Sequence, residues 1–78
     1  MYRSIISVDY YKDYKLILFF DNNEKKIFDA LPYLSRGKFK ELLNVEFFKR
    51  IKVSFDTIEW ENGLDMDPEF LYQESHPF

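Results

Sequence analysis

The sequence predicts a single α+β domain in which an antiparallel sheet packs against short helices. The chain has 78 residues, which is too short for two ordinary domains. Three runs rich in β-forming residues occupy the first thirty positions, and two further runs follow position 50. Helix-start signals lie between and after these runs. We therefore expect an N-terminal three-stranded meander, a C-terminal hairpin and short helices, all in one domain over residues 1–72.

The N-terminal meander is predicted from three runs separated by turn residues. Residues 5–10 form the first expected strand, and residues 14–20 the second. The second is apolar on both faces from Leu16 onward, which is typical of a central strand. Residues 21–24 contain Asp and Asn, which tolerate positive φ and so allow a tight turn without glycine. Residues 25–29 then return as the third strand.

The middle of the chain predicts helix in short pieces. Ser35 can act as an N-cap by accepting a hydrogen bond from a first-turn amide. Phe39, Leu42 and Leu43 then share one face of an α-helix. Asn44 can end this helix or cap a further short turn.

The last third predicts a hairpin, because residues 50–55 and 57–61 both alternate apolar and polar side chains. A two-residue turn at positions 55 and 56 would place apolar residues opposite apolar and basic residues opposite acidic. Phe and Asp are poor residues for such a turn, so a longer loop with the register shifted by two is the alternative. The expected pairs are Val53 with Ile58, Ile51 with Trp60, Lys52 with Glu59, and Arg50 with Glu61. We expect Trp60 to be buried on the face that carries Ile51.

The C-terminal segment carries clear boundary signals. Asn62-Gly63 indicates a turn. Asp67-Pro68-Glu69 indicates a helix start, with an N-cap, a proline at the first helical position and an acid in the first turn. Residues 73–78 show neither caps nor periodicity, so we expect a frayed tail.

The composition argues against most kinds of catalytic, cofactor and metal site. The chain contains no cysteine, one histidine and two glycines, which removes thiolate metal sites and glycine-rich phosphate loops. His76 lies two residues from the end of the sequence, a poor place for a rigidly held catalytic imidazole. The acidic residues after position 55 match no calcium-loop spacing. We expect no enzyme activity, and no catalytic, cofactor or metal site.

The charge distribution bears on partners. The net charge is −3 and the sequence pI is near 5.0, which argues against nucleic acid as the main partner. Residues 40–78 hold four basic and nine acidic side chains, an excess that favours encounter with a basic protein. The sequence has no signal-peptide pattern and no apolar run near the ~20 residues that span a bilayer. We expect no membrane partner and a cytoplasmic location.

Three motifs together resemble a small bacterial family known as domain of unknown function 2442. They are the strand over residues 14–20, a G-x-F-x-x-L over residues 37–42, and I-x-W-x-x-G-x-D-x-x-P-E-x-L-Y over residues 58–72. The resemblance covers residues 3–72. It implies an antiparallel α+β fold, no established enzymatic activity and the bacterial cytoplasm. Members often look like the antitoxin-side partner of a neighbouring small protein in a two-gene module.

Two functional hypotheses follow. The first is a non-enzymatic interaction module, antitoxin-like, whose partner is another protein, for example a basic one encoded nearby. The second is a small-ligand-binding or accessory subunit domain whose aromatic side chains line a pocket. The candidate interaction or motif residues are Glu59, Trp60, Glu61, Asn62, Gly63 and Asp65.

The first strand suggests an association surface. Residues 5–8 carry none of the lysines or prolines that usually protect an edge strand. This segment could support a homodimer or the docking of a partner by edge addition. The alternative is that the C-terminal hairpin pairs with it inside one monomer.

Overall fold

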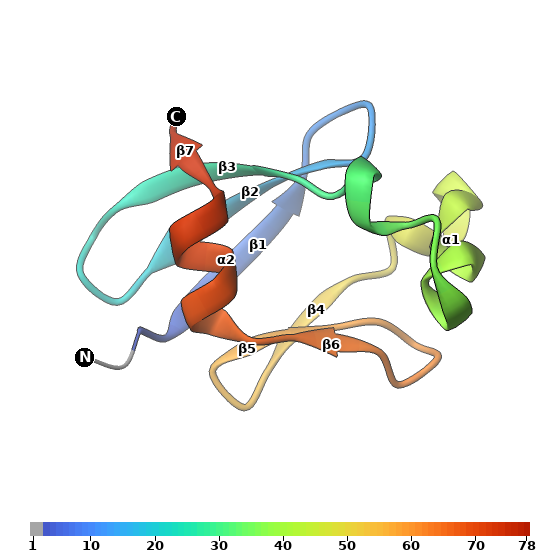
Figure 1. The fold of residues 1–78 in the computed structure, drawn as a ribbon. Coiled ribbons are helices and arrows are strands. Elements are labelled where there is room, and N and C mark those ends of the chain that lie inside the picture. The colour runs from blue at the N-terminus through green and yellow to red at the C-terminus, as the bar shows by residue number, and fades with distance from the viewer. Residues whose placement is uncertain (1–2) are drawn as a thin grey trace.

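The computed structural model describes residues 3–78, and its larger sheet has four antiparallel strands in the order β1–β2–β3–β7 (Figure 1). Strands β1 (Ile5–Tyr10), β2 (Lys15–Phe20) and β3 (Lys25–Asp29) form the predicted meander. Strand β2 lies between the other two, as its apolar composition predicts. The fourth strand, β7 (His76–Pro77), extends the sheet beyond the expected three. The α+β fold class is confirmed.

Residues with positive φ close the turns of the meander. Asn23 has a φ of 71°, and the Phe20 amide donates to the Glu24 carbonyl across this turn at 3.0 Å. Asp13 and Tyr14 adopt φ values of 52° and 62° before β2. An Asn or Asp side chain reaches this region at modest cost, which explains a tight turn without glycine.

Two 3-10 helices, Leu31–Tyr33 and Gly37–Leu43, follow the meander in place of the expected α-helix. The prediction of Ser35 as an N-cap is wrong, because the second of these helices begins after Arg36 and has no side-chain cap. With three residues per turn, only positions three apart share a face. Leu42 is therefore buried while Leu43 is exposed.

Asn44 caps the short helix α1 (Val45–Phe48), as one of its two predicted roles requires. Its Oδ1 accepts hydrogen bonds from the amides of Glu46 and Phe47 at 3.1 and 3.4 Å. These two amides have no partner inside the helix, so the cap satisfies first-turn donors.

The second sheet contains β4 (Lys52–Ser54), β5 (Thr57–Glu59) and β6 (Asp65–Met66) in sequence order. Its hairpin has the predicted two-residue turn and register, and the longer loop is wrong. The observed strand pairs are Lys52 with Glu59, Val53 with Ile58 and Ser54 with Thr57. Arg50 and Glu61 form the expected ion pair beyond the strand ends, at 3.5 Å.

The turn of this hairpin places two non-glycine residues in the left-handed region. Phe55 has a φ of 49° and Asp56 a φ of 73°. Positive φ at both central positions is the geometry that two-residue hairpins prefer, because it matches the strand twist. The matched apolar and charged pairs of this register therefore stabilise the hairpin more than the left-handed backbone of Phe55 destabilises it.

Helix α2 (Pro68–Glu74) begins as predicted. Asp67 is its N-cap, and its Oδ2 accepts from the Phe70 amide at 3.2 Å. Glu69 in the first turn accepts from the Arg3 amide at 2.9 Å, which ties the helix to the start of the chain.

The expected frayed tail over residues 73–78 is wrong. These residues supply the end of α2 and strand β7, which pairs with β3. Lys26 explains the order, because its Nζ donates at 2.7 Å to the carbonyl of Tyr72 near the helix end. The Phe78 amide donates to the Lys25 carbonyl at 3.1 Å, and the Lys25 ammonium lies 4.5 Å from the Phe78 ring centre.

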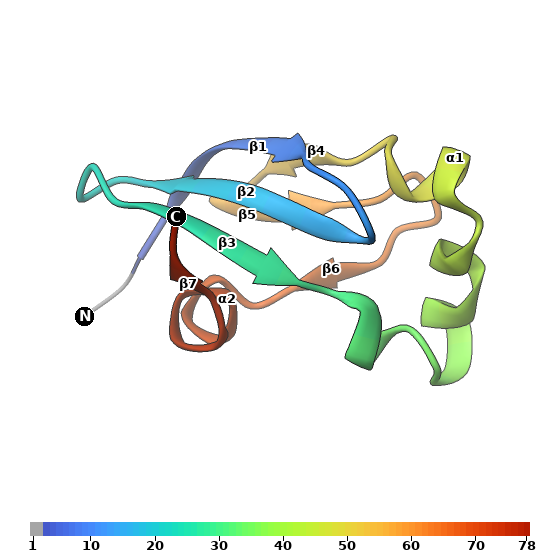
Figure 2. The same ribbon diagram turned by 90° about the horizontal axis from the view of Figure 1, so that it is seen from above.

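The two sheets enclose one apolar core (Figures 1 and 2). Helix α2 closes one side of this core, and the 3-10 segments with α1 close the other. Trp60 is 1% exposed, which confirms its predicted burial, and Ile51 is half-buried against the same core. The other core side chains are Ile5, Leu16, Leu18, Phe20, Phe28, Ala30, Leu34, Leu42, Phe48, Ile58, Met66 and Leu71.

Candidate functional site

The motif residues between β5 and β6 build a turn. The Gly63 amide donates to the Trp60 carbonyl at 3.0 Å, and Gly63 has a φ of 88°. The Oδ1 of Asn62 accepts from the Leu64 amide at 3.2 Å, while its Nδ2 donates to Glu41 at 2.9 Å. The indole Nε1 of Trp60 donates to a buried backbone carbonyl. These three candidate residues therefore make folding contacts.

The three acidic candidates lie on or beside the smaller sheet. Glu59 and Asp65 are cross-strand neighbours on β5 and β6, and Glu61 pairs with Arg50. Like charges directly opposite each other destabilise a strand pair. Lys52, the neighbour of Glu59 on the other side, supplies one positive charge to this row. The structure thus brings Glu59 and Asp65 together as a small acidic surface.

Exposed apolar side chains lie where the two sheets meet, and one of them belongs to the first strand that the sequence suggests as an association surface. The Ile5 amide donates to the Asp56 carbonyl at 2.9 Å, which places the start of β1 beside the β4–β5 turn. Next to this hydrogen bond, Phe55 is 95% exposed and Ile6 is 61% exposed, and Val53 on β4 is 37% exposed. We call Ile6, Val53 and Phe55 the apolar corner. Two sequence signals point to this corner: the unprotected edge over residues 5–8, and Phe55, a bulky residue at a turn position that favours Asn or Gly.

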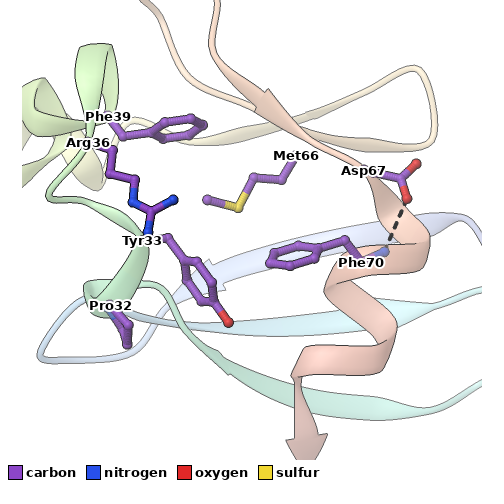
Figure 3. Close-up of a pocket in the computed structure, with 7 residues that line it drawn as sticks. All are labelled: Pro32, Tyr33, Arg36, Phe39, Met66, Asp67 and Phe70. Carbon is purple, nitrogen blue, oxygen red and sulfur yellow. Dashed lines mark hydrogen bonds between the residues drawn. The ribbon is translucent and has the colours of Figure 1, made fainter.

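A second feature is a pocket of about 620 Å³ between the 3-10 segments and the β6–α2 junction (Figure 3). Met66 lies at its centre, between the rings of Phe39 and Phe70, and the Arg36 guanidinium points toward it. The residues of this aromatic pocket are Pro32, Tyr33, Arg36, Phe39, Met66, Asp67 and Phe70.

The rings of the aromatic pocket hold one another in place. Tyr33 and Phe70 meet edge to face, with centroids 5.3 Å apart. Phe28, fully buried behind them, stacks on Tyr33 at 5.6 Å and meets Phe70 at 6.2 Å. Desolvation and the nearby carboxylate of Glu74 raise the pKa of Tyr33, so its ring stays a neutral phenol at physiological pH. The sequence suggests an aromatic-lined pocket as an alternative but does not identify these residues, because the walls come from segments some thirty residues apart.

The described residues form neither a metal-binding cluster nor a membrane-spanning helix. Within residues 3–78, no group of three or more His, Asp or Glu side chains is arranged to hold a metal ion. In the same part of the chain, every helix is too short or too polar to cross a membrane.

The chain belongs to a family whose function has not been assigned. The family model described as "Protein of unknown function (DUF2442)" matches residues 5–77, nearly the whole chain, in agreement with the resemblance of its motifs. No curated protein matches the chain. No solved structure matches it either.

Proposed function

We propose that this protein is a non-enzymatic interaction module that binds a partner protein through the apolar corner. The observation that carries the proposal is Phe55, whose ring is almost fully exposed while its backbone sits at positive φ. For a bulky residue both properties cost stability, through left-handed strain and through unburied apolar surface. Such strain is a reason to look for function, and a rigidly presented aromatic ring is a typical binding hot spot.

The partner that fits is a protein with an apolar pocket and basic residues around it. Ile6 and Val53 are further exposed apolar side chains on the two strands β1 and β4 near the β4–β5 turn, and a partner pocket that covers them with Phe55 would exclude water around the ring. Glu59 and Asp65 place two negative charges on the same small sheet. A basic rim on the partner would relieve their mutual repulsion and raise the rate of encounter.

We propose the antitoxin-like arrangement as the setting, with the partner encoded by the neighbouring gene in the bacterial cytoplasm. The support is the family resemblance, together with a surface suited to a basic protein. Co-expression and co-purification with the neighbouring gene product test this setting directly. If that product binds through a different surface, the apolar corner is not the binding site, but the antitoxin-like setting still holds.

Phe55→Asn separates binding from folding. Asparagine tolerates positive φ, so the free energy of unfolding should rise by up to about 1 kcal/mol. Partner affinity should fall by about 30-fold or more, the loss expected for a hot spot of about 2 kcal/mol. Leu43→Asn is the matched control, because Leu43 is an exposed apolar residue of the second 3-10 helix. Wild-type affinity for Phe55→Asn would refute the role of the corner.

A homodimer through the β1 edge is the second candidate, and one feature of that edge weighs against it. The register of β1 shifts between Ile5 and Ser7, so Ile6 forms a bulge. A bulge and the adjacent hairpin both hinder strand addition, which favours docking by side chains over edge pairing. Sedimentation at micromolar concentration distinguishes the two: a monomer whose β1 amides resist hydrogen exchange excludes the homodimer.

A further inference from the structure

We propose that the aromatic pocket binds a small planar aromatic carboxylate. Its ring would lie among Tyr33, Phe39 and Phe70, and its carboxylate would meet Arg36. The inference goes beyond partner binding at the apolar corner and uses none of the corner's residues. It is carried by the combination of an apolar cavity with one unpaired guanidinium at its wall.

The size and the walls of the cavity suit a small ligand. About 620 Å³ falls within the roughly 300–1,000 Å³ typical of small-molecule sites. The rings of Tyr33 and Phe70 are already fixed against the buried Phe28. A ligand therefore meets a preformed surface, and little side-chain ordering opposes its binding.

The side chains that line the aromatic pocket favour a ligand with an aromatic ring over one with an aliphatic chain. Tyr33 and Phe70 stand at 83° to each other, so an inserted ring meets one face and one edge. Both arrangements suit the charge distribution of an aromatic ring. Met66 adds a polarisable thioether, which contacts aromatic edges favourably.

Arg36 supplies the selectivity for a carboxylate. Among residues 3–78 its guanidinium has no hydrogen-bond or ion-pair acceptor, and Figure 3 shows it on the pocket side near Phe39 and Tyr33. A planar guanidinium binds a carboxylate through two parallel hydrogen bonds.

Asp67, the other charged lining residue, sets the orientation of the ligand. Its carboxylate faces the start of α2, where it caps the Phe70 amide, and in Figure 3 it lies across the pocket from Arg36. A second negative group on the ligand would be repelled at that end. The ligand expected is therefore a monoanion with its carboxylate at Arg36.

Titration of the ¹⁵N-labelled protein with 2-naphthoate tests the site. Saturable shifts should appear at the amides of Phe39, Met66 and Phe70. Arg36→Gln should weaken binding by about 10–100-fold, the value of a hydrogen-bonded charge. Lys38→Gln is the matched control, because Lys38 is a nearby exposed cation that does not line the pocket, and its affinity should not change.

Ligand variants test the same claim in the wild-type protein. 2-Naphthalenemethanol, which lacks the charge, should bind the wild type about as weakly as 2-naphthoate binds Arg36→Gln. 2-Naphthylmethylammonium should bind more weakly than 2-naphthoate. Equal affinity of acid and alcohol, tighter binding of the ammonium, or no shifts with millimolar 2-naphthoate would each overturn the proposal. Phe55→Asn should bind 2-naphthoate normally, so failure at the pocket and failure at the apolar corner are distinguishable.

Discussion

Replacing Trp60 with phenylalanine isolates one buried hydrogen bond in the core. The indole Nε1 donates to the Phe48 carbonyl at 3.0 Å, and both side chains are buried. Phe48 ends helix α1, so its carbonyl has no partner within the helix. The indole therefore caps the C-terminal end of α1 and fixes that helix to the smaller sheet. The rings of Trp60 and Phe48 also pack together, with centroids 5.7 Å apart.

The expected losses differ between two substitutions. Trp60→Phe keeps a ring in the core but leaves the Phe48 carbonyl without a donor, which costs about 1–3 kcal/mol. Trp60→Ala also opens a cavity, and its total cost should be about 3–5 kcal/mol. A domain of this size has a free energy of unfolding of about 4–12 kcal/mol, so the alanine variant should be marginally stable while the phenylalanine variant folds.

Urea denaturation followed by far-UV circular dichroism measures both values, since neither variant retains a tryptophan for fluorescence. Phe55→Leu is a suitable control, because it alters an exposed aromatic residue and should change stability by less than about 0.5 kcal/mol. The reasoning fails if Trp60→Phe is as stable as the wild type within about 0.5 kcal/mol. It also fails if the alanine variant loses no more than the phenylalanine variant.

Substitutions at three further positions test local features. Asp67→Ala should cost about 0.5–2 kcal/mol in urea denaturation, because the Phe70 amide loses its cap, and Asp67→Asn should retain most of that stability. Gly63→Ala should cost about 1–2 kcal/mol, since a Cβ meets no atom there but a φ of 88° strains any L side chain; an unchanged melting temperature would contradict this. The hydrogen bond from Tyr72 lowers the pKa of Glu24 below its ordinary 4.5. The ionised carboxylate of Glu24 therefore stabilises the fold above pH 4.5, and this contribution is lost as the pH falls through the lower folded-state pKa. Glu24→Gln should therefore lose less stability than the wild type between about pH 6 and pH 3, and parallel pH profiles would refute the assignment.

The hairpin was predictable because long-range pairing and local pattern agree there. Matched cross-strand residues favour one register over every other, and a slip of one residue would turn Ile58 out of the core. The alternating residues predict the strand pairs but leave two lengths open for the turn, since Phe55 and Asp56 have low local preference for positive φ. The energy of cross-strand pairing favours the two-residue turn over the longer loop, and this energy can be estimated only when both strands are considered together.

The middle segment was less predictable because periodicity does not separate two kinds of helix over seven residues. Phe39 and Leu42 face inward in either an α-helix or a 3-10 helix, and only Leu43 distinguishes them. The start of this segment was also misplaced. The second 3-10 helix begins at Gly37, which has a φ of 53°, and its N-cap is Arg36, so Ser35 lies outside the helix.

The order of the C-terminal tail could not be read from its own residues. Residues 73–78 contain no cap and no periodic pattern, and their stability comes from Lys25 and Lys26 on β3. The aromatic pocket was hidden for the same reason, since Tyr33 and Phe70 become neighbours only through tertiary packing. Features built from distant segments require the fold, whereas turns, caps and strand pairs follow from local chemistry.

The residues that carry the family resemblance prove to be those that the fold uses most directly. Trp60 caps a helix end, Gly63 supplies a backbone conformation that other residues resist, and Pro68 begins α2. A motif of this kind specifies a scaffold and does not by itself assign a binding activity. The two proposed sites depend most on Phe55 and Arg36, which lie outside the three motifs, although Phe39 and Asp65 belong to them. Phe55 exposes an apolar ring to water at a cost that a partner would remove, whereas the solvated guanidinium of Arg36 can pair with a ligand carboxylate.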